Sequence, residues 1–461
     1  MGGPGHGPRG PDSWSSRDAW PQCAMAGPHN RASARRTAAS CGWRRSCLNL
    51  GQRPQATTTA ALPPPDTVTD TRSDTPARPP TICLVGRAAA QPFSQPPLER
   101  IRRMFARVGA NEIRDDGAGW PDQGLVVLLR ADHVFDDALA RPLVERQDVA
   151  LLAPGSQRPV AAAVPAQKAA EAYRLLSAPD ATATDAEALG LRAITPQSLG
   201  VSYRKNLRNN VPPYVLSAKD MPVAAIEHHM FMASYKGLTD IVTKHVWPAP
   251  ALVATRWCAA HGISPNAVTL LSFLCVVAAT VLFWFGWFLT GLLFAWAMCF
   301  LDTVDGKLAR VTLTSSKWGN VFDHGTDLVH PPFWWFAWYW GLGTLPFAPL
   351  PGMQLAMWVV LAGYVLGRLE EGIFLWAFKF EMFTWRRIDA LSRLVTARRN
   401  PNLIILSVFT LAGRPDIGLA AVAIWTALCI GFHAVRILQA FAERRRGRPV
   451  ASYLAGSGAA A

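Results

Sequence analysis

Residues 301–328 have the sequence LDTVDGKLARVTLTSSKWGNVFDHGTDL, and this stretch decides both the fold and the chemistry that we expect. Four carboxylates lie at the ends of two apolar segments: Asp302, Asp305, Asp323 and Asp327. Each Asp at the centre of a membrane helix costs about 2.5–3.5 kcal/mol. Lys307 and Arg310 supply at most two compensating positive charges. Divalent cations are the simplest compensation, and all-oxygen ligands select Mg²⁺, Mn²⁺ or Ca²⁺.

The spacing of these carboxylates predicts that they converge. The first two are three residues apart and the last two are four apart, so each pair shares one helix face. The eight-residue connection from Val311 to Trp318 predicts two antiparallel neighbouring helices that bring both pairs to the same depth. Gly306 and Gly319 leave room for a ligand or a partner helix. Arg310, one turn beyond Gly306, can grip a diphosphate with its planar fork.

Apolar residues make up 50% of the 461 residues and concentrate after about residue 265. This distribution predicts a soluble front and a membrane-embedded back, because a bilayer core needs about twenty mostly apolar residues per helix. We expect six membrane spans, of which the fifth is short: residues 267–288, 290–310, 320–343, 354–378, 402–414 and 416–440.

The net charge of +14 is divided between the first 80 residues and the loops between apolar segments. Basic and non-basic loops alternate, which predicts an inner-membrane protein with both termini and the acidic cluster on the cytoplasmic side. This pattern argues against nucleic-acid binding, which favours basic residues on one soluble face. The eight cysteines are scattered without a C-x-x-C pair, so we expect a reducing compartment with neither a disulfide framework nor a zinc site.

The segments outside the predicted membrane domain (265–441) differ in composition. Residues 1–80 lack hydrophobic periodicity and predict a disordered tail. Residues 81–200 alternate strands and helices, which predicts a small α/β domain with a parallel sheet. Its expected strands are 81–85, 124–130 and 149–152, and its expected helices are 99–108 and 166–176. Residues 201–264 predict a linker with an interfacial amphipathic helix over 224–258, and residues 442–461 a basic cytoplasmic tail.

The pattern Asp302-x2-Asp305-Gly306-x2-Ala309-Arg310-x8-Gly319-x3-Asp323-x3-Asp327 resembles the signature of the CDP-alcohol phosphotransferase family at every position. The resemblance covers about residues 200–441. It implies a six-helix membrane fold, usually a homodimer, with a polar cavity open to the cytoplasm. It also implies an enzyme that uses two divalent cations, Mg²⁺ or Mn²⁺. Such an enzyme transfers a phosphoryl-alcohol group from a CDP-alcohol to an acceptor hydroxyl, releasing CMP, in phospholipid or phosphodiester biosynthesis.

Residue by residue, the resemblance implies that Asp302, Asp305 and Asp323 are metal ligands. It implies that Asp327 is the general base, with a further contact to a metal. Three residues of the signature correspond to the CDP-binding part: Gly306, Ala309 and Arg310. Asn266 and Thr269 resemble another nucleotide-contacting element, although a helix cap explains a Pro265-Asn266 start equally well.

Several charged residues beyond the signature permit two interpretations. A basic stretch before the fifth span is explained by the orientation of the protein in the membrane and by contact with anionic lipids. Alternatively, this stretch forms a phosphate pocket for the acceptor, made by Arg398, Arg399 and Asn402. Three charges interrupt the fourth span and either pair together or face the cavity: Arg368, Glu370 and Glu371. His324 and His330 are interpreted as structural residues or as residues that contact the metal ligands, and Pro331 and Pro332 as a kink.

Asp132-His133 follows a predicted buried strand and resembles the metal-site strand of sugar-nucleotidyltransferases. Such a domain is fused to the membrane enzyme in di-myo-inositol phosphate phosphate synthase-like proteins. The glycine-rich loop expected after the first strand is missing, because residues 85–92 are VGRAAAQP. A degenerate, non-catalytic domain is therefore favoured over an active cytidylyltransferase.

Alternative functions remain open at this point. The front domain favours an inositol-phosphate-like substrate over a phospholipid, and the sequence names neither donor nor acceptor. A cation transporter would use the acidic helices as an ion path, but the polar cluster stays at one end of the spans. A catalytically inactive membrane anchor would not need the complete signature.

Overall fold

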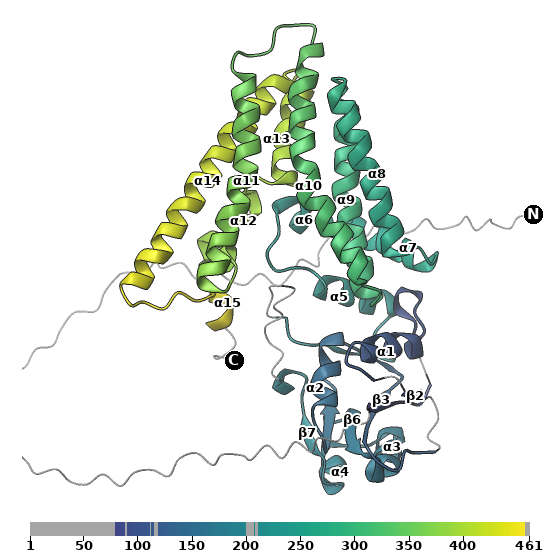
Figure 1. The fold of residues 1–461 in the computed structure, drawn as a ribbon. Coiled ribbons are helices and arrows are strands. Elements are labelled where there is room, and N and C mark those ends of the chain that lie inside the picture. The colour runs from purple at the N-terminus through teal and green to yellow at the C-terminus, as the bar shows by residue number, and fades with distance from the viewer. Residues whose placement is uncertain are drawn as a thin grey trace, which may run out of the picture. The chain divides into compact units, whose positions relative to one another are not determined.

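The computed structural model describes residues 79–87, 90–110, 112–114, 119–199, 207 and 211–456. The chain divides into two units, Met1–Ser73 and Asp74–Ala461. The first unit, which holds most of the predicted disordered tail, lies outside the described residues. The second unit contains an α/β region followed by a helical region (Figure 1).

The α/β region is built on a six-stranded sheet with the order β2-β1-β3-β6-β5-β7. Its strands are β1 (Thr81–Val85), β2 (Glu112–Arg114), β3 (Leu125–Arg130), β5 (Val149–Leu152), β6 (Pro159–Pro165) and β7 (Arg192–Ile194). Strand β1 is parallel to β2 and β3, and β5 is parallel to β7. Two short strands, β4 (His133–Phe135) and β8 (Val215–Ser217), form a separate antiparallel pair.

The three predicted strands, β1, β3 and β5, run parallel to one another, but the sheet is mixed because β6, which was not predicted, runs antiparallel to both β3 and β5. Strand β6 has the sequence PVAAAVP, and alanine has little preference for strands. Its strand character comes from its central place in the sheet, where residues 160–164 are completely buried. Local sequence therefore gave no strand signal at this position.

Both faces of the sheet are covered, which explains the continuous apolar run of β3. Val127 and Leu129 share a core with α1 (Pro97–Ala106) and α2 (Ala140–Val144). Val126 and Leu128 point to the other face and pack with α3 (Ala169–Ser177) and α4 (Ala183–Ala188). Because side chains alternate along a strand, a strand buried on both faces needs apolar residues at every position.

Three helices connect the sheet to the long helices: α5 (Val223–Ala233), α6 (Ile241–His245) and α7 (Pro248–Ala260). The amphipathic segment expected over 224–258 thus forms three helices. The break after α5 includes Gly237, and α7 begins at Pro248, a residue that is favourable only in the first turn of a helix.

The remaining helices are α8 (Pro265–Trp284), α9 (Phe288–Val311), α10 (Lys317–Gly341), α11 (Met353–Phe378), α12 (Arg387–Val395), α13 (Arg399–Leu411), α14 (Pro415–Arg445) and α15 (Tyr453–Gly456). Among the described residues, α8, α9 and α14 are long and apolar enough to cross a membrane. Helix α13 has 13 residues, about 20 Å at 1.5 Å per residue, which is shorter than a bilayer core of about 30 Å. The count of six spans stays a prediction.

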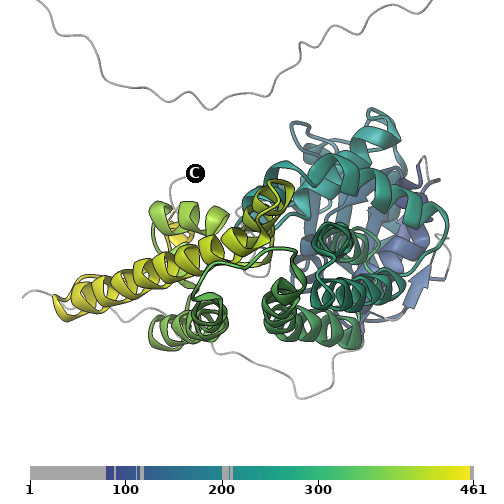
Figure 2. The ribbon, with the colours of Figure 1, turned by 90° about the horizontal axis from the view of Figure 1, so that it is seen from above.

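Helix α8 packs along both α9 and α10, and α14 packs against α11 and α13 at an oblique angle (Figures 1 and 2). Helices α9 and α10 were expected to be close neighbours, but their extensive backbone contacts are with α8 rather than with each other. A core of buried aromatic residues, including Trp334, Trp335 and Trp338 of α10, fills the space beside α8 and α9. Helix α10 continues through Pro331 and Pro332.

Candidate active site

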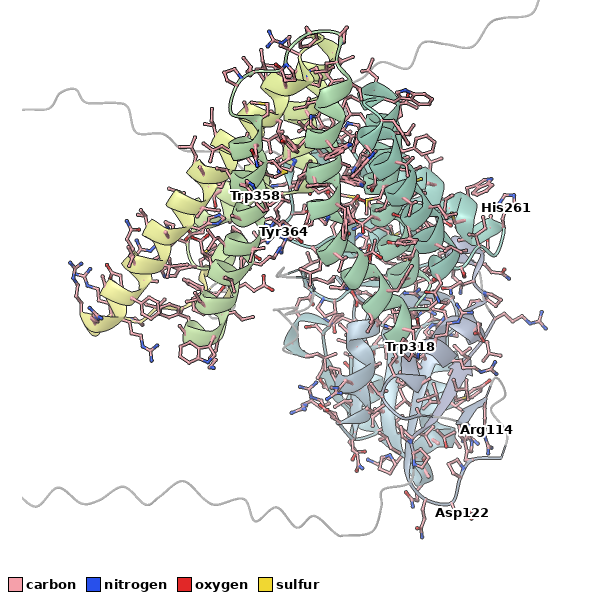
Figure 3. All side chains as sticks on the ribbon, turned by 45° about the horizontal axis from the view of Figure 1, so that its top comes forward. Arg114, Asp122, His261, Trp318, Trp358 and Tyr364 are labelled. Carbon is pink, nitrogen blue, oxygen red and sulfur yellow. The ribbon has the colours of Figure 1, made fainter. Side chains whose placement is uncertain are left out.

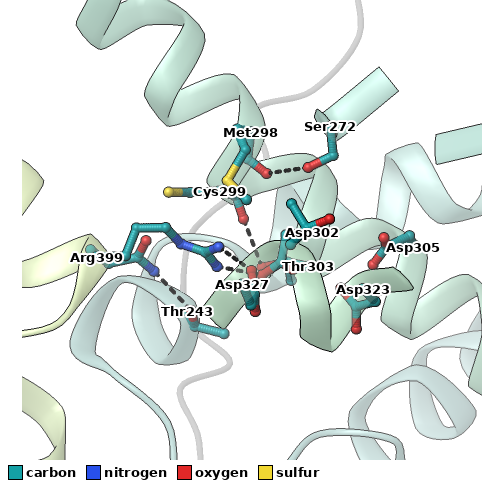
Figure 4. A network of polar contacts seen from close by, with 12 residues as sticks. Thr243, Ser272, Met298, Cys299, Asp302, Thr303, Asp305, Asp323, Asp327 and Arg399 are labelled. Atoms are coloured by element: carbon teal, nitrogen blue, oxygen red, sulfur yellow. Dashed lines mark hydrogen bonds and ion pairs between the residues drawn. The ribbon is translucent and has the colours of Figure 1, made fainter. Parts of the chain in front are cut away.

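The carboxylates of the signature gather between the end of α9 and the beginning of α10 (Figure 4). Asp302, Asp305 and Asp323 each place one oxygen within 4.8 Å of the others. The sequence spacing explains this local arrangement, since the five-residue turn over 312–316 reverses the chain between the two helices. Three of the four predicted metal ligands therefore lie together.

Asp305 is the most buried of these acids, with 3% of its surface exposed. Its Oδ2 accepts a 2.6 Å hydrogen bond from the hydroxyl of Thr269 on α8, whereas its Oδ1 is buried without a hydrogen-bond partner among the described residues. A buried carboxylate oxygen without a partner is costly. The donor set of three clustered carboxylates, one of them with an unsatisfied oxygen, therefore fits a hard divalent cation.

Asp327 and Asp302 share a basic neighbour that Asp305 and Asp323 lack. Arg399, at the start of α13, donates a 2.6 Å hydrogen bond to Asp302 Oδ2 and pairs with Asp327 Oδ1 through its other terminal nitrogen. Figure 4 shows the Arg399 side chain reaching Asp302 and Asp327, while Asp305 and Asp323 lie on the other side of these two acids. The guanidinium thus bridges Asp302 and Asp327, a contact that no local pattern of residues indicates.

A cavity of about 690 Å³ opens beside the acidic cluster. Helices α9, α10 and α11 line it together with Thr426 of α14 and residues of the segments 381–383 and 393–402. Residues 235–243 between α5 and α6 contribute another wall, which sequence reasoning missed because this segment precedes the signature. The acidic cluster therefore faces a space large enough for a nucleotide-sized ligand.

Two glycines of the signature allow close approach. A Cβ atom at Gly306 would lie 3.2 Å from both terminal nitrogens of Arg310, so the missing side chain lets the guanidinium fold back along α9. A Cβ atom at Gly319 would lie 2.6 Å from Oδ1 of Asn266, so this glycine lets the start of α8 approach α10. Gly306 and Arg310 both line the cavity.

The other predicted nucleotide-binding residues take different places. Thr269 hydrogen bonds to Asp305, and its hydroxyl also contacts the carbonyl oxygen of Pro265 at 3.1 Å. The carbonyl oxygen of Ala309 accepts a 3.0 Å hydrogen bond from the backbone N–H of Thr314 in the turn after α9. Neither Thr269, Ala309 nor Asn266 is among the residues that line the cavity.

The three predicted acceptor-binding residues all line the cavity: Arg398, Arg399 and Asn402. Arg398 pairs with Glu371 of α11, and Glu371 also contacts Arg368 at 3.4 Å. Both Arg368 and Glu371 line the cavity, while Glu370 lies 3.3 Å from His433. Arg368 and Glu371 are therefore paired and face the cavity, whereas Glu370 forms no hydrogen bond with its neighbour His433.

The side chain of Asn400 ties α13 to the segment before α6. Its amide donates a 2.9 Å hydrogen bond to Asp240, whose carboxylate also caps α6 through the backbone N–H of Val242 and Thr243. Burial opposes the charge on Asp240, but the hydrogen bonds from Asn400 and Thr243 outweigh it and lower the pKa of Asp240. This contact fixes the beginning of α13, from which Arg399 reaches the acidic cluster.

The histidines near the cluster differ in exposure. His330 is buried, its Nδ1 lies 2.7 Å from the carbonyl oxygen of Thr326, and its ring packs edge-on against Trp334. His324 is largely exposed, 3.7 Å from Asp323. The packing of His330 agrees with the structural interpretation.

Asp132, in the α/β region, is surrounded by cationic groups. Its oxygens accept hydrogen bonds from Arg130 at 3.0 and 2.7 Å, and they lie 2.7 Å from His133 and 3.0 Å from Lys219. Burial favours the neutral acid, but these partners outweigh it and hold the pKa of Asp132 well below its usual range. The carboxylate that resembles a nucleotidyltransferase metal ligand is thus engaged by side chains of the chain itself.

The arrangement of an acidic cluster, a nearby arginine and a large polar cavity agrees with one protein family. Residues 262–433 match the family model of CDP-alcohol phosphatidyltransferase. The match includes the complete signature and all four aspartates.

Three curated relatives are similar to part of this chain. A choline/ethanolaminephosphotransferase 1 of Arabidopsis thaliana is 29% identical over 27% of the chain and 37% of its own length. A cholinephosphotransferase 1 of Xenopus laevis is 29% identical over 32% of the chain and 40% of its own length. A cholinephosphotransferase 1 of Danio rerio is 31% identical over 26% of the chain and 33% of its own length. The matches thus span well under half of each relative.

Proposed function

We propose that this protein is a membrane-bound CDP-alcohol phosphotransferase, which transfers a phosphoryl-alcohol group from a CDP-alcohol to an acceptor hydroxyl and releases CMP. The observation that carries the proposal is the cluster of Asp302, Asp305 and Asp323 beside a cavity of about 690 Å³. The family domain over residues 262–433 agrees with it.

In this proposal, Asp302, Asp305 and Asp323 hold two divalent cations, Mg²⁺ or Mn²⁺, with Asp327 as a further ligand. Bound there, the cations would neutralise the diphosphate and stabilise the charge that develops on the leaving CMP. Thr269 holds Asp305 in place through the hydrogen bond at 2.6 Å. Arg310, folded over Gly306, lies where a phosphate group in the cavity can be bound by its planar fork.

Asp327 is proposed as the general base. An alcohol is a poor nucleophile at neutral pH, so its proton must pass to a nearby base during attack. Asp327 lines the cavity, and its pairing with Arg399 fixes the direction of its carboxylate. Arg398, Arg399 and Asn402 line the same cavity and are proposed to contact the acceptor.

The names of the curated relatives indicate which substrates to test first. Their names describe choline and ethanolamine phosphotransferases, so we propose CDP-choline or CDP-ethanolamine as the first donors to test and a lipid alcohol as the acceptor. This choice places the enzyme in phospholipid biosynthesis and ranks an inositol-phosphate-like substrate second.

The arrangement in the membrane is part of the same proposal. We propose a six-helix domain over 265–441 made by α8, α9, α10, α11, α13 and α14, which forms a homodimer with its cavity and both termini in the cytoplasm. The apolar surfaces of α8, α9 and α14 support membrane insertion. The α/β region, 81–200, is proposed to be non-catalytic, which the pairing of Asp132 with Arg130, His133 and Lys219 supports.

The test is release of CMP by the purified full-length protein with Mg²⁺ or Mn²⁺ and a panel of CDP-alcohols and acceptor alcohols. We expect at least one pair to release CMP, and we expect Asp327→Asn to lower the rate about 100-fold or more, because the amide cannot accept the proton.

Asp122→Asn is the matched control, since this exposed acid lies in the loop before β3 and should leave the rate unchanged. The proposal fails if no pair releases CMP, or if Asp327→Asn releases it as fast as the unchanged protein.

A further inference from the structure

Lys307 of α9 is a buried cation that the proposed mechanism does not use. Only 2% of its surface is exposed, and its Nζ has no hydrogen-bond partner among the described residues. The ammonium lies over the ring of Tyr235, 2.7 Å from its centroid, and 5.2 Å from the ring centroid of Phe231. Aromatic faces attract a cation, but they do not replace the three hydrogen bonds that an ammonium makes in water.

The surroundings of Lys307 indicate which kind of group would pair with its ammonium. Lys307 lines the cavity, as do Arg310 one turn later on the same helix and Lys236 from the segment before α6. Three cationic residues therefore contribute to one part of the wall. An unpaired buried charge is unfavourable unless a group of opposite charge is supplied. An anion that enters the cavity would supply this partner.

The wall beside Lys307 comes from outside the family domain. Tyr235 follows α5, which packs against α9 through Ile226, Met230 and Phe231 in a core that includes Val304 and Leu308. The family model begins at residue 262, so Phe231, Tyr235 and Lys236 belong to a segment that the model does not cover. Two aromatic residues of this segment, Phe231 and Tyr235, place their rings against the Lys307 ammonium.

We propose that Lys307, with the wall formed by Tyr235 and Lys236, is a phosphate-binding subsite for the diphosphate of a cytidine nucleotide. The subsite deepens the proposed function and rests on it, because the diphosphate donor is the anion that would enter this cavity. Lys307 donates to a phosphate oxygen, while the carboxylates of Asp302, Asp305 and Asp323 hold the cations beside the same group.

The experiment compares the full-length protein with Lys307→Met and Lys307→Arg, and measures the dissociation constant of CDP in the presence of Mg²⁺ by calorimetry. Methionine keeps much of the apolar stem and removes the charge. Because a hydrogen bond to a charged group is lost, we expect CDP binding to weaken about tenfold or more in Lys307→Met. Arginine should recover part of the affinity.

Two controls separate the phosphate contact from a general disturbance. Lys244→Met removes an exposed lysine of α6 that does not line the cavity, and it should bind CDP as tightly as the unchanged protein. Cytidine, which lacks phosphate, should bind with the same affinity to the unchanged protein and to Lys307→Met.

The melting temperature without ligand distinguishes a binding role from a structural one. If Lys307 has only a structural role, replacing it should lower the melting temperature. Replacing an unpaired buried charge by an apolar side chain of similar length should leave the melting temperature of Lys307→Met unchanged or raise it. A lower melting temperature would show that the ammonium already has its partner within the protein, which overturns the proposal.

The failure of this inference and that of the proposed function are distinguishable. If the unchanged protein binds CDP and Lys307→Met binds it equally well, the subsite is wrong and the enzyme proposal stands. If Lys307→Met weakens the binding of CDP and of cytidine equally, the subsite is also wrong, because the substitution has then changed the shape of the cavity. If CDP binds to none of these proteins, both proposals fall.

Discussion

At the scale of single residues, the site depends on a few polar contacts between helices that are distant in sequence. Thr269 and Asp305 are 36 residues apart and join α8 to α9 through one hydrogen bond of 2.6 Å. One oxygen of Asp305 lies within 4.8 Å of oxygens of Asp302 and Asp323, and its Oδ1 has no hydrogen-bond partner among the described residues. Thr269 therefore orients a proposed metal ligand without reaching the cavity itself.

Thr269→Val tests this role, since valine keeps the shape of threonine and removes the hydroxyl. Residues that orient metal ligands typically change metal affinity by about 10–100-fold. We expect the Mg²⁺ concentration for half-maximal CMP release to rise about tenfold or more, with little change in the rate at saturating Mg²⁺. Thr280→Val is the control, because the Thr280 hydroxyl donates a hydrogen bond to the carbonyl oxygen of Val276 on its own helix. Equal Mg²⁺ dependence in both variants would contradict the role.

At the scale of helices and strands, close approach decides how α8 and α10 cross. Gly341, the last residue of α10, lies against the backbone of α8, and a Cβ there would collide with the carbonyl oxygen of Phe283 and lie 3.0 Å from the backbone nitrogen of Gly286. Backbone atoms cannot move aside as a flexible side chain can. The absence of a side chain at Gly341 therefore sets the separation of the two helices.

Gly341→Ala should destabilise the protein by about 1–3 kcal/mol, the usual cost of forcing an extra carbon into a packed interior. The midpoint of thermal or denaturant unfolding in detergent measures this cost. Gly343→Ala is the matched control, because a Cβ at Gly343 has no atom within 4 Å. The explanation fails if the two variants unfold at the same midpoint.

At the scale of the whole described chain, the α/β region holds the turn that joins the two acidic helices. Arg100 of α1 is 5% exposed and donates a 2.8 Å hydrogen bond to the carbonyl oxygen of Val311, the last residue of α9. The side chains of Gln95 and Arg103 donate to the carbonyl oxygen of Thr312 at 2.7 and 3.0 Å. Leu313, with a positive φ of 57°, packs in the core of the α/β region.

These contacts satisfy carbonyl groups that the end of α9 leaves without helical partners, and a positive charge is favourable at that end. They also fix the turn between Asp305 and Asp323. The α/β region therefore stabilises the geometry of the site whether or not it has an activity of its own.

Arg100→Met should leave the Val311 carbonyl oxygen buried without its partner and lower the free energy of unfolding by about 1–3 kcal/mol. Because the turn then has fewer restraints, we also expect slower release of CMP. Arg102→Met is the control, since Arg102 is exposed and pairs only with Glu99 on its own helix. If Arg100→Met and Arg102→Met have the same stability and rate, the α/β region does not support the site.

Whether the sequence predicted a feature of this protein depends on how far apart in the sequence the interacting residues lie. The carboxylate pairs, the apolar helices and the buried strand β3 arise from periodicities of a few residues, so the sequence was sufficient to predict them. The direction of β6 was not predictable, because PVAAAVP lacks a local strand signal and is stabilised only by its neighbours β3 and β5.

The sequence by itself determined that the aspartates of each pair share one helix face, because their spacing matches the pitch of a helix. Only the tertiary structure decided their partners. Arg399 lies 97 residues from Asp302, and Asn400 lies 160 residues from Asp240. Pairs at such separations depend on how several helices pack together, and no local pattern of residues specifies that packing.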